Sequence, residues 1–236
     1  MRIAVISGEK EFTNQLREVL AAQGFCVDVI SDAKRALASI ESEPTALVLL
    51  DETSPAGGGY EILRRLRMKS AIPVFMLLRW DKPEDRIASL EAGADDCLGR
   101  PFHPVELTAR VRSILRRSVS STDSAVIEAS DVRVDTKSRE VFFEGKPVSV
   151  TTIEFDVLVV LIRSAGRPVS RDEMMDQLYH RKANPFDRSI DMHVSHLRRK
   201  FVSKPDLIKT VRGEGYQFCL PGQSEVALAK GSGVTG

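Results

Sequence analysis

The sequence predicts an α/β unit with a five-stranded parallel sheet, followed by a smaller α+β unit. Three observations support this division. Short β-rich runs alternate with helical patterns through the first half of the 236-residue chain. A small, polar stretch at 118–124 is followed by short strands, three helices and a hairpin. Charge is also uneven: residues 181–212 hold nine Lys or Arg against three Asp, whereas residues 1–117 hold 17 of each sign.

Each strand candidate of the first half is followed by an amphipathic stretch. The expected strands are Arg2–Ile6, Phe25–Val29, Ala46–Leu50, Ile72–Leu77 and a short one near Cys97–Leu98. The expected helices cover about 9–22, 32–41, 59–69, 83–92 and 103–117. Because parallel strands need crossover connections, this order predicts a doubly wound, flavodoxin-like sheet with helices on both faces.

The second half predicts four short antiparallel strands, then three helices and a hairpin. The strands are expected at 125–128, 131–135, 139–143 and 147–150. Capping-box patterns at Thr151–Glu154 and Ser170–Glu173 open two helices, and a third runs from about Asp187 to Val202. The hairpin joins 208–211 to 216–220. The expected domains are 1–118 and 125–220, with a linker at 119–124 and a disordered tail at 221–236.

The third helix has one apolar and one polar face. Ile190, Val194, Leu197 and Phe201 form the stripe expected to face a core. The opposite side is polar and cationic; it carries Arg188, Met192, Ser195 and Arg199, flanked by Ser189 and His196. This face is suited to the major groove of DNA, and the following hairpin carries Arg212 at its turn, which is suited to the minor groove. A solvated amphipathic helix is the alternative, and the neighbouring helices and hairpin favour DNA.

The runs PFDRSIDMHVSHLRRKF (185–201) and KTVRGEGYQF (209–218) together resemble the winged-helix effector domain of OmpR/PhoB-type response regulators. The resemblance implies binding to tandem half-sites of double-stranded DNA, with Thr210 and Arg212 in the wing. The loop at about 180–186 would be offered to RNA polymerase. Ser195 and His196 stand where many relatives carry arginines, so the site preference of relatives does not transfer.

The first half resembles the receiver domain of the same family. The matching motifs are LLD (49–51), Pro55, Gly58, AIPV (71–74), GADD (93–96) and RPF (100–102). Asp51 matches the aspartate that relatives phosphorylate, at the carboxyl edge of the sheet where ligands bind in such folds.

The other residues of that phosphorylation site differ from the family's pattern. Relatives carry an acidic pair that holds Mg²⁺, a hydroxyl, a lysine and a switching aromatic residue; here these positions are Ser7 and Gly8, Leu78, Arg100 and Cys97. Glu9 and Glu52 remain alternative metal ligands. The hypothesis is a receiver that works without phosphorylation, in which Asp51 pairs with Arg100. A cofactor is therefore not expected; Mg²⁺ belongs only to the alternative, a conventional two-component regulator phosphorylated on Asp51 by a histidine kinase.

The resemblance also implies a homodimer through the receiver, on the face formed by the fourth helix, fifth strand and fifth helix. Three complementary pairs are expected across it: Arg86 with Glu106, Asp95 with Arg110, and Asp96 with Arg117. Exposed ion pairs contribute only about 0–1 kcal/mol each, so their role would be partner choice.

Several other classes of protein fit the sequence less well. The three cysteines are scattered, and no apolar run is long enough for a signal peptide or membrane span, so a cytoplasmic protein without disulfides is expected. His193 and His196 lack further ligands at metal-binding spacing. No catalytic constellation or Gly-rich phosphate motif supports an enzyme or flavodoxin-like cofactor binder. An interaction protein whose altered receiver binds another regulator or a small ligand stays as a rival.

Overall fold

The computed structural model describes residues 1–54, 58–119, 126–179 and 189–221, without the side chains of 33, 34 and 117–119. Two compact units divide the chain, the first made chiefly of Met1–Ser120. None of the helices in these ranges combines the length and the apolar character needed to cross a bilayer.

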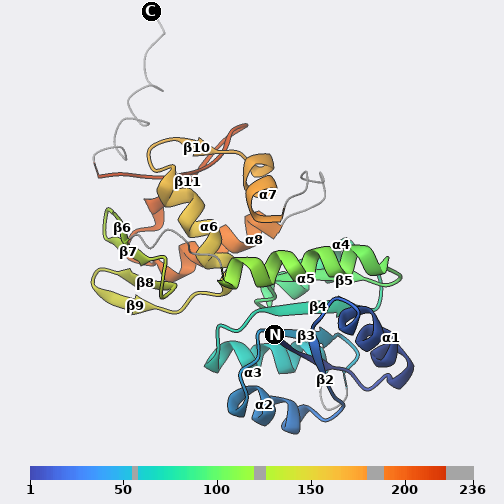
Figure 1. Ribbon diagram of the computed structural model, residues 1–236. Helices are drawn as coiled ribbons and strands as arrows, with labels where there is room; N and C mark the ends of the chain where they lie inside the picture. The colour runs from blue at the N-terminus through green and yellow to red at the C-terminus, as the bar shows by residue number, and fades with distance from the viewer. Residues whose placement is uncertain (55–57, 120–125, 180–188, 222–236) are drawn as a thin grey trace, which may run out of the picture. The chain divides into compact units, whose positions relative to one another are not determined.

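The first unit is a doubly wound α/β fold (Figure 1). Its elements are β1 Arg2–Ile6, α1 Lys10–Ala21, β2 Cys26–Ile30, α2 Ala33–Ser42, β3 Leu47–Asp51, α3 Gly59–Lys69, β4 Val74–Leu78, α4 Pro83–Glu91, β5 Asp96–Gly99 and α5 Pro104–Val119. All neighbouring strands are parallel, in the order β2-β1-β3-β4-β5. The predicted flavodoxin-like sheet is confirmed.

Two apolar layers enclose this sheet. Leu16 and Leu20 of α1 pack on one face together with Leu107 and Val111 of α5. On the other face lie side chains of α2, α3 and α4, among them Leu63. β3 and β4 are buried along their whole length, as expected of central strands covered on both faces. Since the strand order reverses between β1 and β3, the carboxyl ends of these strands form the crevice where such folds place their site.

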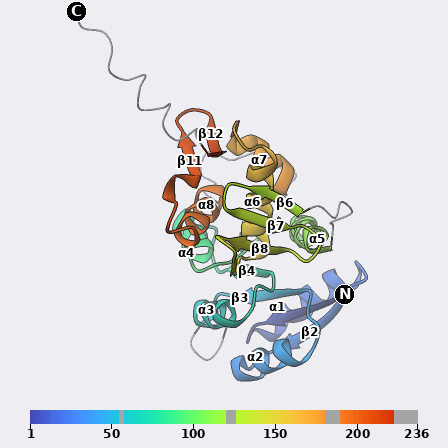
Figure 2. The same cartoon turned by 90° about the vertical axis from the view of Figure 1, so that its left-hand side faces the viewer.

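The second unit begins with an antiparallel sheet of four strands in sequence order: β6 Val126–Ala129, β7 Val132–Asp135, β8 Glu140–Phe143 and β9 Lys146–Val148. Helices α6 Thr152–Arg163, α7 Arg171–Tyr179 and α8 Ser189–Lys200 follow, and a hairpin of β11 Ile208–Val211 and β12 Gly215–Phe218 comes last. Figure 2 shows this hairpin near α8. The arrangement is a winged helix, as predicted.

The core of the second unit combines its sheet with the apolar stripe of α8. Val194, Leu197 and Phe201 are all buried, and the Phe201 ring lies 5.0 Å from that of Phe143 on β8. This confirms the apolar stripe predicted from helical periodicity. The Ser170 cap is also present, because its hydroxyl accepts the Glu173 N–H at 3.0 Å.

Two short elements were not predicted. β10 Pro168–Val169 joins β12 to form a three-stranded sheet, and a 3-10 turn η1 at Pro205–Leu207 leads into β11. Two residues carry too little periodicity to predict a strand, and the pairing of β10 depends on a partner almost 50 residues away in sequence.

Candidate functional site

The exposed side of α8 presents cations at its C-terminal end. Arg199 is exposed, Ser195 is half-buried, and the last turn carries three consecutive basic residues. Cations in the last turn complement the helix dipole, so they also stabilise the helix that displays them. Met192 and Ser189 lie on the first turns of α8. Ser189 is buried, which corrects its expected place on the outer face, and Arg188 lies outside the described residues.

His196 does not face outward as predicted. Its Nδ1 lies 3.3 Å from Oε1 of Glu154 on α6, and Lys200 donates a short hydrogen bond to the other oxygen of the same carboxylate. His196 borders the buried stripe of α8, so a carboxylate on the neighbouring helix can reach it. The expectation that His196 reads DNA is corrected: it holds α8 against α6.

The wing is a tight hairpin that ends in exposed Arg212. Thr210 is also exposed, on β11. Gly215 opens β12 at φ 134°, and a Cβ there would lie 2.1 Å from the Val169 carbonyl oxygen. Only glycine accepts both that backbone and that approach, so Gly215 fixes the turn that carries Arg212.

Arg198 joins α8 to the wing and was not predicted. Its Nε donates to the Ile208 carbonyl at 2.8 Å, and its Nη2 donates to the Thr210 hydroxyl at 2.9 Å. Its guanidinium also lies 5.7 Å from the centre of the Tyr216 ring. Helical periodicity places Arg198 between the two faces of α8, and no sequence signal links it to strands ten or more residues later.

The carboxyl edge of the first sheet holds a compact polar cluster around Asp51. Asp51 is 1% exposed, and Nη2 of Arg100 lies 2.8 Å from its Oδ2. The Ser7 hydroxyl donates to the same oxygen at 2.6 Å, while the backbone N–H and hydroxyl of Thr53 both donate to Oδ1 at 3.0 Å. The predicted pairing of Asp51 with Arg100 is confirmed.

Arg100 is fixed by two further contacts. Its Nη1 donates to Glu9 Oε2 at 2.6 Å, and its guanidinium carbon lies 3.3 Å from the centre of the Phe12 ring. Its Nη2 makes an ion pair with Asp51 without the alignment of a hydrogen bond. The guanidinium therefore neutralises two carboxylates and stacks on an aromatic face.

This donor set does not fit Mg²⁺. A magnesium ion prefers six oxygen ligands, including carboxylates free to bind it. Here Gly8 offers no side chain, Glu9 is engaged by Arg100, and Oε2 of Glu52 accepts the Arg79 N–H at 2.8 Å. Within the described ranges, no group of three or more His, Cys, Asp or Glu could hold a metal ion.

Leu78 and Cys97 occupy the remaining altered positions. Leu78 ends β4 and is buried, and so brings no hydroxyl to the edge near Asp51. Cys97 is buried on β5, where burial, with a smaller effect of Asp96, raises the pKa of its thiol to about 12. A thiol with this pKa is uncharged at neutral pH and therefore unreactive.

Where the structure describes them, the charges expected at a dimer face are already paired within the chain. Arg110 binds Asp96 at 3.1 Å and Glu106 at 2.8 Å. Burial works against the charge of Arg110, but Asp96 and Glu106 outweigh it and raise its pKa above the ordinary value. Arg86 donates to Asp81 at 2.6 Å. The side chain of Arg117 lies outside the described residues.

Asp95 is a correction to the expected dimer face. Its side chain is fully buried, and Oδ2 accepts from Arg67 at 2.7 Å and from the Val74 N–H at 2.8 Å. Since this carboxylate ties α3 to β4 inside the first unit, it does not reach Arg110 of a second chain. Side chains of successive residues in or next to a strand point to opposite faces. Asp95 therefore points into the first unit, and its neighbour Asp96 is the one that contacts Arg110.

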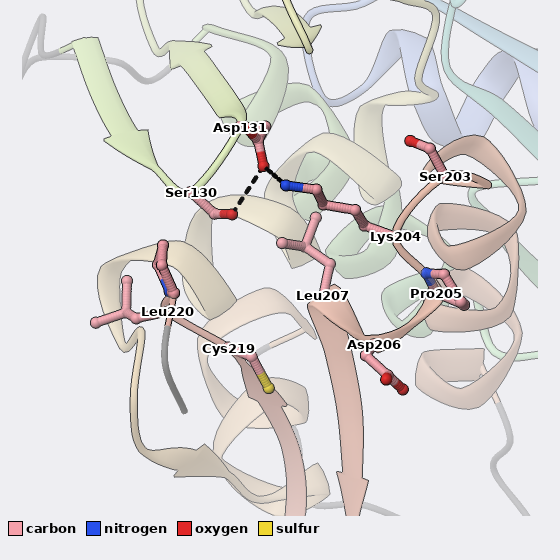
Figure 3. Close-up of a pocket in the computed structure, with 10 residues that line it drawn as sticks. Ser130, Asp131, Ser203, Lys204, Pro205, Asp206, Leu207, Cys219 and Leu220 are labelled. Carbon is pink, nitrogen blue, oxygen red and sulfur yellow. Dashed lines mark hydrogen bonds and ion pairs between the residues drawn. The ribbon is translucent and has the colours of Figure 1, made fainter. Parts of the chain in front are cut away.

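A cavity of about 620 Å³ lies in the second unit (Figure 3). Residues 203–207 and 219–221 line it, together with Ser130 and Asp131. Asp131 accepts hydrogen bonds from both Lys204 and Ser130, as the dashed lines show. Because it lies at the opposite end of β11 and β12 from the Arg212 turn, it is not part of the candidate DNA interface.

The chain is similar to known proteins along both units. Residues 3–112 match the family model "Response regulator receiver domain", and residues 145–218 match "Transcriptional regulatory protein, C terminal". The transcriptional regulatory protein CpxR of Klebsiella pneumoniae is 38% identical over 225 residues, which cover 91% of this chain and 97% of that one. The sensory transduction protein RegX3 of Mycolicibacterium smegmatis is 33% identical over 223 residues, covering 92% and 98%.

A solved structure of a RitR mutant shares the fold, with a TM-score of 0.76, 21% identity, and coverage of 92% of this chain and 98% of that one. Both family models match in order, and the curated relatives align over nearly the whole chain. The chain therefore belongs to the OmpR/PhoB-type response regulators, a family of DNA-binding transcription regulators with a receiver and a C-terminal regulatory domain.

Proposed function

We propose that this chain binds specific DNA sequences through α8 and the wing, as a receiver-mediated homodimer on tandem half-sites, without phosphorylation of Asp51. The observation that carries the DNA-binding part is the connected pair of elements α8 and β11–β12. The last turn of α8 carries exposed Arg199, and the turn of the hairpin carries exposed Arg212. Arg198 links the two elements. A helix and a hairpin of this kind enter adjacent grooves of a duplex.

The first test selects a binding site and measures its salt dependence. A random duplex pool is enriched on the full chain, and the affinity of the most enriched duplex is measured by fluorescence anisotropy. If four phosphates are neutralised, the affinity should fall about a hundredfold between about 50 and 200 mM salt. Failure to enrich any duplex, or an affinity that salt does not change, would contradict DNA binding and favour an interaction protein.

Phosphorylation independence is supported by the Asp51–Arg100 pair. The carboxylate that relatives phosphorylate is buried, accepts three hydrogen bonds and already has a cation fixed beside it. A phosphoryl group on Asp51 would need a second source of positive charge, which a bound Mg²⁺ supplies in phosphoryl transfer. The nearby carboxylates that would hold this ion, Glu9 and Glu52, are engaged elsewhere.

The second test incubates the full chain with acetyl phosphate and Mg²⁺ and measures the intact mass. The unmodified chain should persist. A variant with Ser7→Asp, Gly8→Asp, Leu78→Thr and Arg100→Lys, which supplies the missing groups, should gain one phosphoryl group at Asp51. Stoichiometric modification of the unaltered chain would instead support the conventional regulator phosphorylated by a histidine kinase.

A further inference from the structure

We propose that Arg198 is a positioning residue that sets the distance between the recognition helix α8 and the wing, rather than a residue that grips DNA. The inference rests on the proposed function, and it names the element that makes two separate DNA-contacting parts act as one. It also gives Thr210 a second role, as the acceptor for this link.

Arg198 uses two of its five N–H donors inside the protein, both toward β11. Nε donates to the Ile208 carbonyl and Nη2 to the Thr210 hydroxyl, on residues of the same strand two positions apart. Since a guanidinium is planar and rigid, two such bonds fix both the distance and the angle between α8 and β11. The Tyr216 ring, 5.7 Å from the guanidinium carbon, adds a contact to the partner strand β12.

The next residue offers a direct contrast. Arg199 carries the same charge, but it is exposed, and among the described residues it has no hydrogen bond or ion pair. Arg199 is therefore free to bind a phosphate or a base, while Arg198 is held toward the wing. Two adjacent arginines on one helix thus have different tasks, because they point about 100° apart around its axis.

A fixed wing matters because its turn has few contacts of its own. Arg212 and its neighbours at the turn are exposed, and the turn glycine Gly213 has nothing within 4 Å of where a Cβ would lie. A loose hairpin would lose conformational freedom when it enters a groove, and that loss would weaken binding. By restraining β11 in the free protein, Arg198 reduces this cost.

The test is a double-mutant cycle on the full chain with the most enriched duplex from the random pool. Arg198→Gln should weaken binding about tenfold, the size expected for lost charge-assisted hydrogen bonds. In an Arg212→Gln background, where the wing contact is already lost, the same change should cost about threefold or less. The matched control Arg199→Gln removes the same charge one residue along, and its effect should be equal in both backgrounds.

A second readout does not involve DNA. Amide hydrogen exchange in β11 and β12 of the free protein should be faster in Arg198→Gln and unchanged in Arg199→Gln. Thr210→Val, which removes the acceptor and no charge, should also speed exchange in the wing. It serves as the test variant if Arg198→Gln does not fold.

The outcomes separate this inference from the function on which it rests. Additive effects of Arg198→Gln and Arg212→Gln, with unchanged exchange in the wing, would overturn the positioning role and make Arg198 a direct DNA contact. If Arg199→Gln and Arg212→Gln leave the affinity unchanged while exchange in the wing still rises in Arg198→Gln, the positioning role holds and the proposed DNA interface fails.

Discussion

Asp51 and Arg100 show how one side chain can change the chemistry of a site. An arginine at this position reaches Asp51, Glu9 and the Phe12 ring together. Three engaged partners hold the guanidinium in place, so the carboxylate is neutralised by the chain itself.

This pair should contribute measurably to stability. Asp51→Ala leaves Arg100 without its buried partner and should lower the free energy of unfolding of the first unit by about 2 kcal/mol, less than for a fully buried pair. Trp80, the single tryptophan, lies in this unit and reports its unfolding in urea by fluorescence. Adding Arg100→Met should cost less in the Asp51→Ala background than alone; fully additive effects would mean that the two side chains do not interact.

Cys97 makes the stability of the first unit depend on pH. Its pKa is raised from 9.0 to about 12 in the folded chain, so above pH 9 the unfolded chain releases a proton that the folded chain retains. The contribution of this thiol to stability is therefore complete below pH 9 and falls as the pH rises toward 12, by about 2 kcal/mol near pH 10.5. Urea unfolding of the native chain and Cys97→Ala across this range should give a steeper decline for the native chain. Parallel curves would contradict the shift.

Single residues were harder to place from the sequence than the motifs that contain them. The departures at Ser7, Gly8 and Arg100 could be found by position alone. Which of two adjacent aspartates points inward could not, because that depends on the exact start of β5 and on Arg67 in α3. His196 was misplaced for a similar reason, because its partner Glu154 lies 42 residues earlier in the chain.

At the scale of elements, the wing depends on one backbone position. Gly215→Ala would place a methyl group 2.1 Å from the Val169 carbonyl oxygen at a φ of 134°, so the β10–β12 pairing must shift. The expected cost is more than about 3 kcal/mol in the unfolding of the second unit, followed by circular dichroism.

Gly213 provides the matched control for this change. It also has a positive φ, 78°, but open space around the added methyl group, so Gly213→Ala should cost only about 1 kcal/mol. Equal costs at the two glycines would mean that backbone conformation alone, and not the approach of β10, makes Gly215 necessary.

The elements themselves followed closely from the sequence. Hydrophobic periodicity located the strands and helices to within a few residues, because burial on one face or both imposes a repeat that the sequence carries. β10 and the contacts of Arg198 were not visible, because they join segments through tertiary pairing and carry no local pattern. The candidate DNA interface was therefore predictable as a helix and a hairpin, while the Arg198 contacts that join the two were not.

For the whole molecule, self-association follows from the proposed homodimer. Regulators of this family commonly dimerise. Arg110→Glu would reverse a charge next to Asp96 and Glu106 on the expected face and should weaken self-association in analytical ultracentrifugation. The control Arg112→Glu changes another α5 arginine, one that donates to Gln23 at 2.6 Å, and should leave association unchanged. Circular dichroism checks that both variants fold; unchanged sedimentation of a folded Arg110→Glu chain would argue against this face.

The central claim is that α8 and the wing together hold a duplex. The most direct measurement is the affinity of the full chain for its selected duplex when Arg199 and Arg212 are both changed to Gln. Because both side chains are exposed, the unfolding curve should not move, while the affinity should fall at least about a hundredfold and approach that for unrelated DNA. A folded double variant that binds the selected duplex as tightly as the parent would contradict the account.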